Sequence, residues 1–249
     1  MLGIETASRQ ASVAALRMPE EAILAELSGE GGREQGARLL DQVDACLRRG
    51  GATLGDLGAV AVSIGPGSFT GLRVGLATAK GIALGAGAAL VGIATLEALA
   101  LAMAASPSGG AAEILCPCLD ARKGEVYAAV FRREADGRVE RLGPDRALAP
   151  AAFAAELAAY AGESKSLLLA GPGAERYGEV FADRRGCPSA AVEGGFAPPP
   201  ARFVALLGAR RLRTCGADDP ARLIPRYVRA PEAERARRRE DFGDAAGRH

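Results

Sequence analysis

Histidine, the side chain most often used for acid–base and zinc chemistry near neutral pH, occurs once in this sequence, as His249. A Ser–His–Asp triad needs an imidazole held in place by a third group. A His-Glu-x-x-His zinc site needs two imidazoles on one helix. One histidine at the last position supplies neither arrangement, so the sequence excludes both kinds of site.

Cysteine, another metal-binding residue type, occurs five times. Cys116 and Cys118 are separated by one residue, which is shorter than the spacer of a zinc-binding pair. Because cysteine is frequently buried and these two lie in an apolar run, we predict a buried strand here. The odd number of cysteines and the lack of a basic leader segment favour a reducing cytoplasm. The remaining cysteines are Cys46, Cys187 and Cys215.

A glycine-rich turn is the feature best suited to binding an anion. Gly65-Pro-Gly-Ser68 follows an apolar strand predicted over residues 59–64, and Ser68 is a good N-cap for a helix that reaches residue 86. The N-terminus of such a helix can bind phosphate. Lys80 lies about three turns into the helix, however, so this turn is not a Walker loop and we do not predict a nucleotide site from it.

The helix after this turn contains glycines where alanine would be more stable. Each interior glycine costs about 1 kcal/mol relative to alanine. Gly71 and Gly75 share one face, which Thr78 and Ala79 extend. A face without side chains allows another backbone to approach closely. That backbone could belong to a strand or helix of the same chain, or to a second chain, and the pattern favours neither alternative.

Apolar periodicity predicts the elements that position these residues. An amphipathic helix is predicted over residues 33–49, and Thr95 is predicted to cap a helix that ends at residue 103. Residues 106–110 are predicted to link two lobes, and the charged tail over residues 232–249 is predicted to be disordered. The other predicted strands span residues 2–6, 11–16, 22–27, 89–93, 114–119, 125–132 and 166–170, with helices over 150–160 and from Pro200 to 213 and an extended piece over 224–228.

Two predicted hairpins resemble each other. One opens at Ile4-Glu5 and the other at Leu119-Asp120, and each continues through a short polar turn into an apolar strand. Chance similarity between two alanine-rich hairpins is one explanation. The other is a duplication, which predicts an α/β, actin-like (ASKHA or ribonuclease H-like) two-lobed fold. The expected lobes are residues 1–106 and a smaller lobe of residues 111–231.

Composition limits the partners that this chain can bind by itself. Hydrophobic residues make up 49% of the 249 residues and the net charge is +1, so a folded protein without a global basic field for nucleic acid is expected. The longest apolar stretch, residues 81–103, contains four glycines and Glu97. Strand and helix pieces explain that stretch better than a membrane span, so no membrane association is predicted.

The run Gly65-Pro-Gly-Ser-Phe-Thr-Gly-Leu-Arg-Val-Gly75, followed by Ala79-Lys-Gly81, resembles the hallmark of the TsaB (YeaZ) family. The opening strand Leu2-Gly-Ile-Glu-Thr-Ala-Ser8 is similar to that of the family, in which aspartate is common at the position of Glu5. Two further segments, residues 119–127 and 225–229, resemble its second-lobe hairpin and its C-terminal Tyr-hydrophobic-Arg element. The resemblance covers nearly the whole chain, closely to about residue 130.

The resemblance implies a non-catalytic subunit. TsaB-like proteins are similar to the catalytic subunit TsaD and pair with it through their first two helices, and the ATPase TsaE joins them. Their complex places threonylcarbamoyl on adenosine 37 of tRNAs that read ANN codons. ATP, a metal ion and threonylcarbamoyl-adenylate are then expected in the partner complex, with no cofactor bound by this chain alone. Contact with tRNA is expected through the complex, and homodimerisation when the partner is missing.

The implied partner interface lies on the two helices over residues 33–49 and 68–86. The candidate interface residues are Gln35, Arg38, Leu39, Gln42, Cys46, Phe69, Leu72, Arg73, Gly75, Leu76 and Ala79.

Two sites of the wider family look degraded in this sequence. The TsaD-like His-Met-Glu-Gly-His motif corresponds to Thr95-Leu-Glu-Ala-Leu99, where neither end residue can replace an imidazole and Glu97 is expected to be solvated. The second-lobe turn, glycine-rich in actin-like ATPases, contains Arg122 and Lys123. These two cations could meet an anion such as tRNA phosphate, although solvated surface charge is the commoner case.

A competing hypothesis is an autonomous actin-like ATPase or small-molecule kinase. It rests on the hairpin pattern and on Glu5, Thr6, Ser8 and Asp120, which are expected near the cleft between the lobes. A metallopeptidase is disfavoured by the lack of internal histidine.

Overall fold

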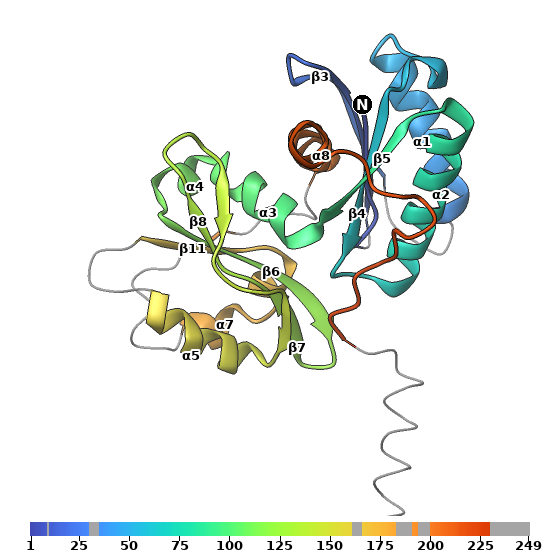
Figure 1. The fold of residues 1–249 in the computed structure, drawn as a ribbon. Coiled ribbons are helices and arrows are strands. Elements are labelled where there is room, and N and C mark those ends of the chain that lie inside the picture. The colour runs from blue at the N-terminus through green and yellow to red at the C-terminus, as the bar shows by residue number, and fades with distance from the viewer. Residues whose placement is uncertain (9, 30–34, 161–165, 183–190, 194–199, 230–249) are drawn as a thin grey trace, which may run out of the picture.

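The chain forms two lobes, each built on its own sheet (Figure 1). The computed structural model describes residues 1–8, 10–29, 35–160, 166–182, 191–193 and 200–229. The predicted tail over residues 232–249 lies outside the described residues. Within the described part of the chain, no helix has both the length and the apolar character that crossing a bilayer requires.

The first sheet has the strand order β3-β2-β1-β4-β5. Its first three strands are antiparallel, and β1, β4 and β5 are parallel. Every residue of β4 is buried, which confirms the prediction from its apolar run. The bounds are β1 (Leu2–Glu5), β2 (Ala11–Arg17), β3 (Ala22–Gly29), β4 (Ala59–Gly65) and β5 (Ala89–Ala94).

Helices cover both faces of the first sheet. The helices α1 (Gln35–Arg49) and α2 (Phe69–Ala86) lie on the outer face, and α3 (Thr95–Ala104) and α8 (Ala201–Cys215) lie on the side toward the second lobe (Figure 1). Ser68 caps α2 as predicted, because its Oγ accepts a hydrogen bond from the Gly71 N–H at 3.3 Å. The helix ends at Gly87, whose φ of 61° is left-handed.

The second sheet has the order β10-β7-β6-β11-β12, with β8 pairing both β6 and β9. Residues 125–132, predicted as one strand, form two. The first pairs with the C-terminal half of β6 and the second with its start, so the chain must bend between them. Cys116 and Cys118 are buried in β6, as predicted. The strands are β6 (Ile114–Arg122), β7 (Glu125–Ala128), β8 (Phe131–Arg133), β9 (Val139–Arg141), β10 (Arg146–Leu148), β11 (Leu167–Ala170) and β12 (Ala191–Glu193).

The two sheets share one connectivity. The order β2-β1-β4-β5 in the first is repeated by β7-β6-β11-β12 in the second, and in each a hairpin is followed by two parallel strands. This repeated topology agrees with the duplication that the two hairpins suggested, and the fold is the actin-like two-lobed α/β fold. The helices of the second lobe are α5 (Pro150–Tyr160), α6 (Pro172–Arg176) and α7 (Gly178–Ala182).

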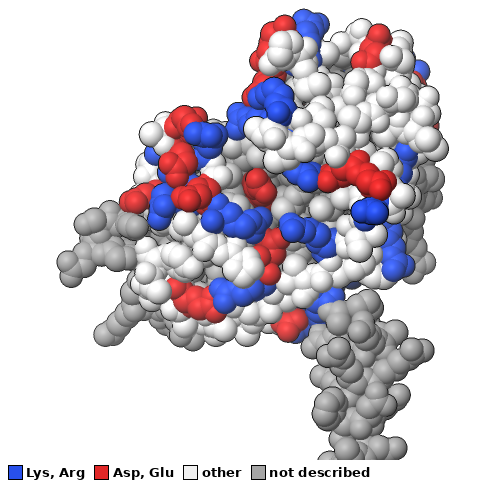
Figure 2. All heavy atoms as spheres, in the orientation of Figure 1, with Lys and Arg blue, Asp and Glu red and all other residues white. Residues whose placement is uncertain are grey.

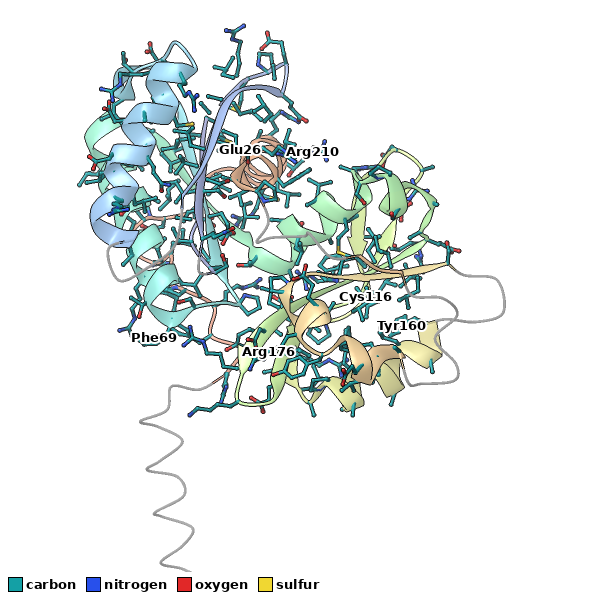
Figure 3. All side chains as sticks on the ribbon, turned by 180° about the vertical axis from the view of Figure 1, so that it is seen from behind. Glu26, Phe69, Cys116, Tyr160, Arg176 and Arg210 are labelled. Atoms are coloured by element: carbon teal, nitrogen blue, oxygen red, sulfur yellow. The ribbon has the colours of Figure 1, made fainter. Side chains whose placement is uncertain are left out.

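The boundary expected for the second lobe, 111–231, differs from the structure. Helix α8 packs on the first sheet, and ion pairs at 2.6 Å and 3.3 Å join its Arg202 and Arg210 to Glu26 and Glu21 of the β2–β3 hairpin (Figure 3). The segment after it, which we call the C-terminal strap (residues 218–229), also returns to the first lobe. The Asp218 N–H donates a hydrogen bond to the Leu90 carbonyl oxygen (2.8 Å), and the Arg226 N–H donates one to the Ile64 carbonyl oxygen (2.6 Å). These sparse hydrogen bonds do not make residues 224–228 a strand.

One local prediction was wrong. Thr95 does not cap α3, because Ala94 occupies the N-cap position and Thr95 is the first helical residue, with its Oγ buried and without a hydrogen-bond partner. The segment predicted as a linker, residues 106–110, contains most of the short helix α4 (Pro107–Ala111).

Candidate functional site

The outer surface of α1 and α2 exposes apolar side chains. Leu40 on α1 is 57% exposed, and Phe69 and Leu84 on α2 are 41% and 86% exposed. Leu54, in the 3-10 helix Leu54–Asp56 that follows α1, is 51% exposed. We call this surface the helix-pair face. Its exposed residues include Arg38, Leu40 and Asp41 of α1 and Phe69, Arg73, Ala77 and Leu84 of α2.

The structure divides the predicted interface residues into two groups. Arg38, Phe69 and Arg73 are exposed and Gln42 is half-buried, whereas the side chain of Gln35 lies outside the described residues. The other six belong to the core in this conformation, because the same three- and four-residue spacing that makes α1 and α2 amphipathic turns these residues toward the sheet. These core residues are Leu39, Cys46, Leu72, Gly75, Leu76 and Ala79.

The glycine face of α2 packs within the chain, which is the intramolecular one of the two alternatives. A Cβ at Gly71 would lie 2.0 Å from the carbonyl oxygen of Thr6, and one at Gly75 would lie 2.0 Å from the Oγ1 of the same residue. Thr6 follows directly after β1 and is fully buried. The glycines therefore allow α2 to lie against the end of β1. Leu40 and Leu84, which the predicted set does not include, are exposed apolar residues that lie off the buried face of their helices.

An aromatic contact joins the helix-pair face to the C-terminal strap. The rings of Phe69 and Tyr227 have centroids 5.0 Å apart, and the Arg73 guanidinium lies 3.8 Å from the Phe69 centroid. Arg73 Nε also donates to the Tyr227 hydroxyl at 3.0 Å. Tyr227 is 38% exposed, so the strap adds to the surface at the start of α2. Figure 3 labels Phe69 at this end of the helix.

A buried carboxyl group lies behind α2. Glu5 is fully buried, and burial raises its pKa to about 7 although Ser63 and the Ala7 backbone both donate hydrogen bonds to it. Ser63 comes from β4, the parallel neighbour of β1, so the sheet brings these two side chains together. Of the four residues on which the kinase hypothesis rests, Glu5 and Thr6 are closed to solvent and Ser8 is half-buried. Asp120, in the other lobe, pairs with Arg176 at 3.5 Å.

Comparison with known proteins places the chain among its relatives. The family model "TsaD: tRNA N6-adenosine threonylcarbamoyltransferase" matches residues 30–167. An uncharacterized protein of Mycobacterium tuberculosis is 31% identical over 234 residues, 94% of this chain and 93% of that relative. The tRNA threonylcarbamoyladenosine biosynthesis protein TsaB of Escherichia coli is 42% identical over 105 residues, which cover 42% of this chain and 44% of that relative. The chain belongs to the TsaB (YeaZ) family.

Solved structures agree with the fold of the TsaB family. YeaZ from Pseudomonas aeruginosa superimposes with a TM-score of 0.72 at 23% identity, over 91% of this chain and 98% of that one. A crystal structure of an uncharacterized protein with similarity to peptidase YeaZ, from the same organism, gives 0.77 at 23% identity, over 92% and 98%.

In this TsaB-family chain, the positions that resemble the TsaD metal motif are packed in the core. Thr95 and Leu99 are fully buried, and Leu99 lies in the cluster that α3 forms with β6. Glu97 is half-buried rather than solvated. Burial raises the pKa of its carboxyl, and the nearby Arg141 offsets only part of this increase. Among the described residues, no group of three or more His, Cys, Asp or Glu side chains is placed to hold a metal ion.

Proposed function

We propose that this chain is a non-catalytic subunit that binds a TsaD-like catalytic subunit and supports formation of N6-threonylcarbamoyladenosine at position 37 of tRNAs that read ANN codons. Two observations support a role in this modification: the TsaB relatives are named as tRNA threonylcarbamoyladenosine biosynthesis proteins, and the TsaD family model matches this chain. A TsaE-like ATPase joins this complex in the cytoplasm. The chain meets tRNA as part of the complex.

The docking role is proposed because exposed apolar side chains gather on the helix-pair face. The described residues include seven large apolar side chains that are exposed. Three are on α1 and α2, one is in the 3-10 helix beside them, and Tyr227 stacks on Phe69. Such a concentration on one side of a small protein marks an interaction surface. The remaining two are Ile23 of β3 and Ile224 of the strap.

We assign catalysis to the TsaD-like partner because the residues of this chain do not fit a metal ion or a nucleotide. Thr95 has a hydroxyl and Leu99 has no ligand atom, and both are fully buried. Glu5 and Thr6 are likewise closed beneath α2, so a nucleotide cannot reach them in this conformation. The proposal therefore assigns ATP, the metal ion and threonylcarbamoyl-adenylate to the partner proteins.

Replacing Leu84 with glutamate tests the docking face. Leu84 is 86% exposed, so the change should leave the fold intact. A charge introduced into an apolar contact must be desolvated, which should weaken binding of the purified TsaD-like subunit by about tenfold or more. Isothermal titration calorimetry measures the affinity, and modification of adenosine 37 with and without the chain measures its consequence.

The matched control is Ile23→Glu, an exposed apolar residue of β3 outside the helix-pair face. It should bind the TsaD-like subunit as the wild type does. If Leu84→Glu and Leu40→Glu both retain full affinity, the helix-pair face is not the docking surface. Without the partner, the same face is expected to support a homodimer, which Leu84→Glu should dissociate.

A further inference from the structure

The tip of the β6–β7 hairpin holds two long cations in a backbone conformation that favours glycine. Arg122 has a φ of 60° and Lys123 a φ of 54°, followed by Gly124 at 77°. Arg122 pairs with Glu125 across the hairpin, and the register shifts between Asp120 and Arg122. Left-handed φ places Cβ close to the following carbonyl, so two such residues in succession destabilise the turn. Glycine, asparagine or aspartate would normally occupy these positions.

Surrounding contacts hold the strained tip in one place. The Asp120 side chain accepts a hydrogen bond from the Arg122 N–H at 2.8 Å. From the C-terminal strap, Arg229 donates to the Ala121 carbonyl at 3.2 Å and pairs with Glu125 at 3.3 Å. The strap therefore ties the hairpin of the second lobe to the first lobe. The side chains of Arg122 and Lys123 are exposed.

The charge around the hairpin is mainly positive. Four cations, Arg122, Lys123, Arg176 and Arg229, lie on or beside it. Among the described residues, Asp120 of β6 faces Arg176 and Glu125 of β7 faces Arg229. Figure 2 shows Lys and Arg atoms, with Asp and Glu atoms among them, along the seam between the lobes and down to the start of the grey tail, and Figure 3 labels Arg176. This local excess contrasts with a net charge of +1 for the whole chain.

We propose that this hairpin tip contacts the sugar–phosphate backbone of the RNA substrate, an inference that rests on the proposed function. Projecting cations that are fixed by the backbone match phosphate, which attracts them independently of base sequence. An acidic protein surface is the alternative occupant. It is less well matched, because protein-binding surfaces centre on exposed apolar anchors and none of those in the described residues lies on this hairpin.

The test replaces both cations with residues that the backbone prefers, as Arg122→Gly/Lys123→Asn. This variant should melt at the same temperature as the wild type or a few degrees higher, because the strain is relieved. In the assembled complex with the TsaD-like and TsaE-like subunits, its affinity for an unmodified transcript of an ANN-reading tRNA should fall by about 5- to 10-fold per lost contact at 0.1 M salt. The slope of log affinity against log salt should become shallower by about 1 to 2.

The control is Arg132→Ser/Arg138→Ser, which removes two positive charges from the β8–β9 hairpin of the same lobe. It should leave the tRNA affinity and its salt dependence unchanged. Unchanged tRNA affinity and slope in the tip variant, with complex formation intact, overturn this inference and leave the proposed function standing. Weaker binding of the TsaD-like subunit by the tip variant, with unchanged tRNA affinity, would assign the tip to an acidic protein surface instead. Failure of the wild-type chain to bind the TsaD-like subunit contradicts both proposals.

Discussion

Replacing Gly71 with alanine is expected to lower the free energy of unfolding by about 3 kcal/mol or more, although alanine is the better helix former. The new methyl carbon would lie 2.0 Å from the carbonyl oxygen of Thr6 and 3.2 Å from its carbonyl carbon. Those are backbone atoms of a fully buried residue at the end of β1, so relief requires α2 to move away from the sheet. Chemical denaturation followed by circular dichroism measures the loss.

The same substitution at Gly81 provides the control. Gly81 lies ten residues further along α2, is exposed, and would place its Cβ with nothing within 4 Å. Gly81→Ala should therefore stabilise the protein by about 1 kcal/mol, the intrinsic difference between the two residues in a helix. Equal effects of the two substitutions would show that α2 does not approach β1 as the structure has it.

This pair of substitutions separates two roles of the glycines in the family motif. Gly71 and Gly75 bring α2 onto Thr6, and their replacement acts through folding. A larger residue at Gly75 would weaken partner binding indirectly, so it cannot test the docking face. A substitution at Leu84 can test that face, because Leu84 is exposed to solvent in the isolated chain.

Apolar periodicity was sufficient to predict most of the fold. The run from residue 59 to residue 64 is apolar apart from Ser63, and β4 is buried on both faces as that pattern requires. Ser68 follows a glycine-rich turn, and it caps α2. These predictions succeed because each depends on neighbours in sequence, which fix the local conformation.

The failures concern contacts between distant segments. Whether Gly71 faced its own chain or another could not be predicted, because the answer depends on Thr6, more than 60 residues away. The return of α8 and the strap to the first sheet depends on pairs such as Arg202 with Glu26, which no local pattern marks. The interface on α1 and α2 was implied by the family resemblance, which does not say which helix face points outward, so the predicted set includes core residues such as Leu39 and Leu76.

Replacing Glu5 with glutamine is expected to make the free energy of unfolding less dependent on pH. The native pKa of Glu5 is about 7, against an ordinary value of 4.5, so the native state holds the proton more tightly than the unfolded chain does. The stability that this carboxyl contributes is thus fully present below pH 4.5 and is lost as the pH rises through 7. The full loss amounts to about 3 kcal/mol.

Glutamine can keep both hydrogen bonds of Glu5, since its carbonyl can accept from the Ala7 N–H and its amide can donate to the Ser63 hydroxyl. Relative to the wild type, Glu5→Gln should be nearly equal in stability near pH 4 and more stable by about 3 kcal/mol above pH 8. Urea denaturation at a series of pH values measures this difference. Glu179→Gln, a change at an exposed residue, should leave the pH dependence as it is in the wild type.

A Glu5→Gln variant whose stability follows pH as the wild type does would show that water reaches the Glu5 carboxyl where it lies among β1, β4 and α2. The burial of Glu5 is also the reason why a nucleotide cannot reach it in this conformation. The pH dependence of folding therefore tests, without any ligand, whether the residues that resemble a kinase site are closed.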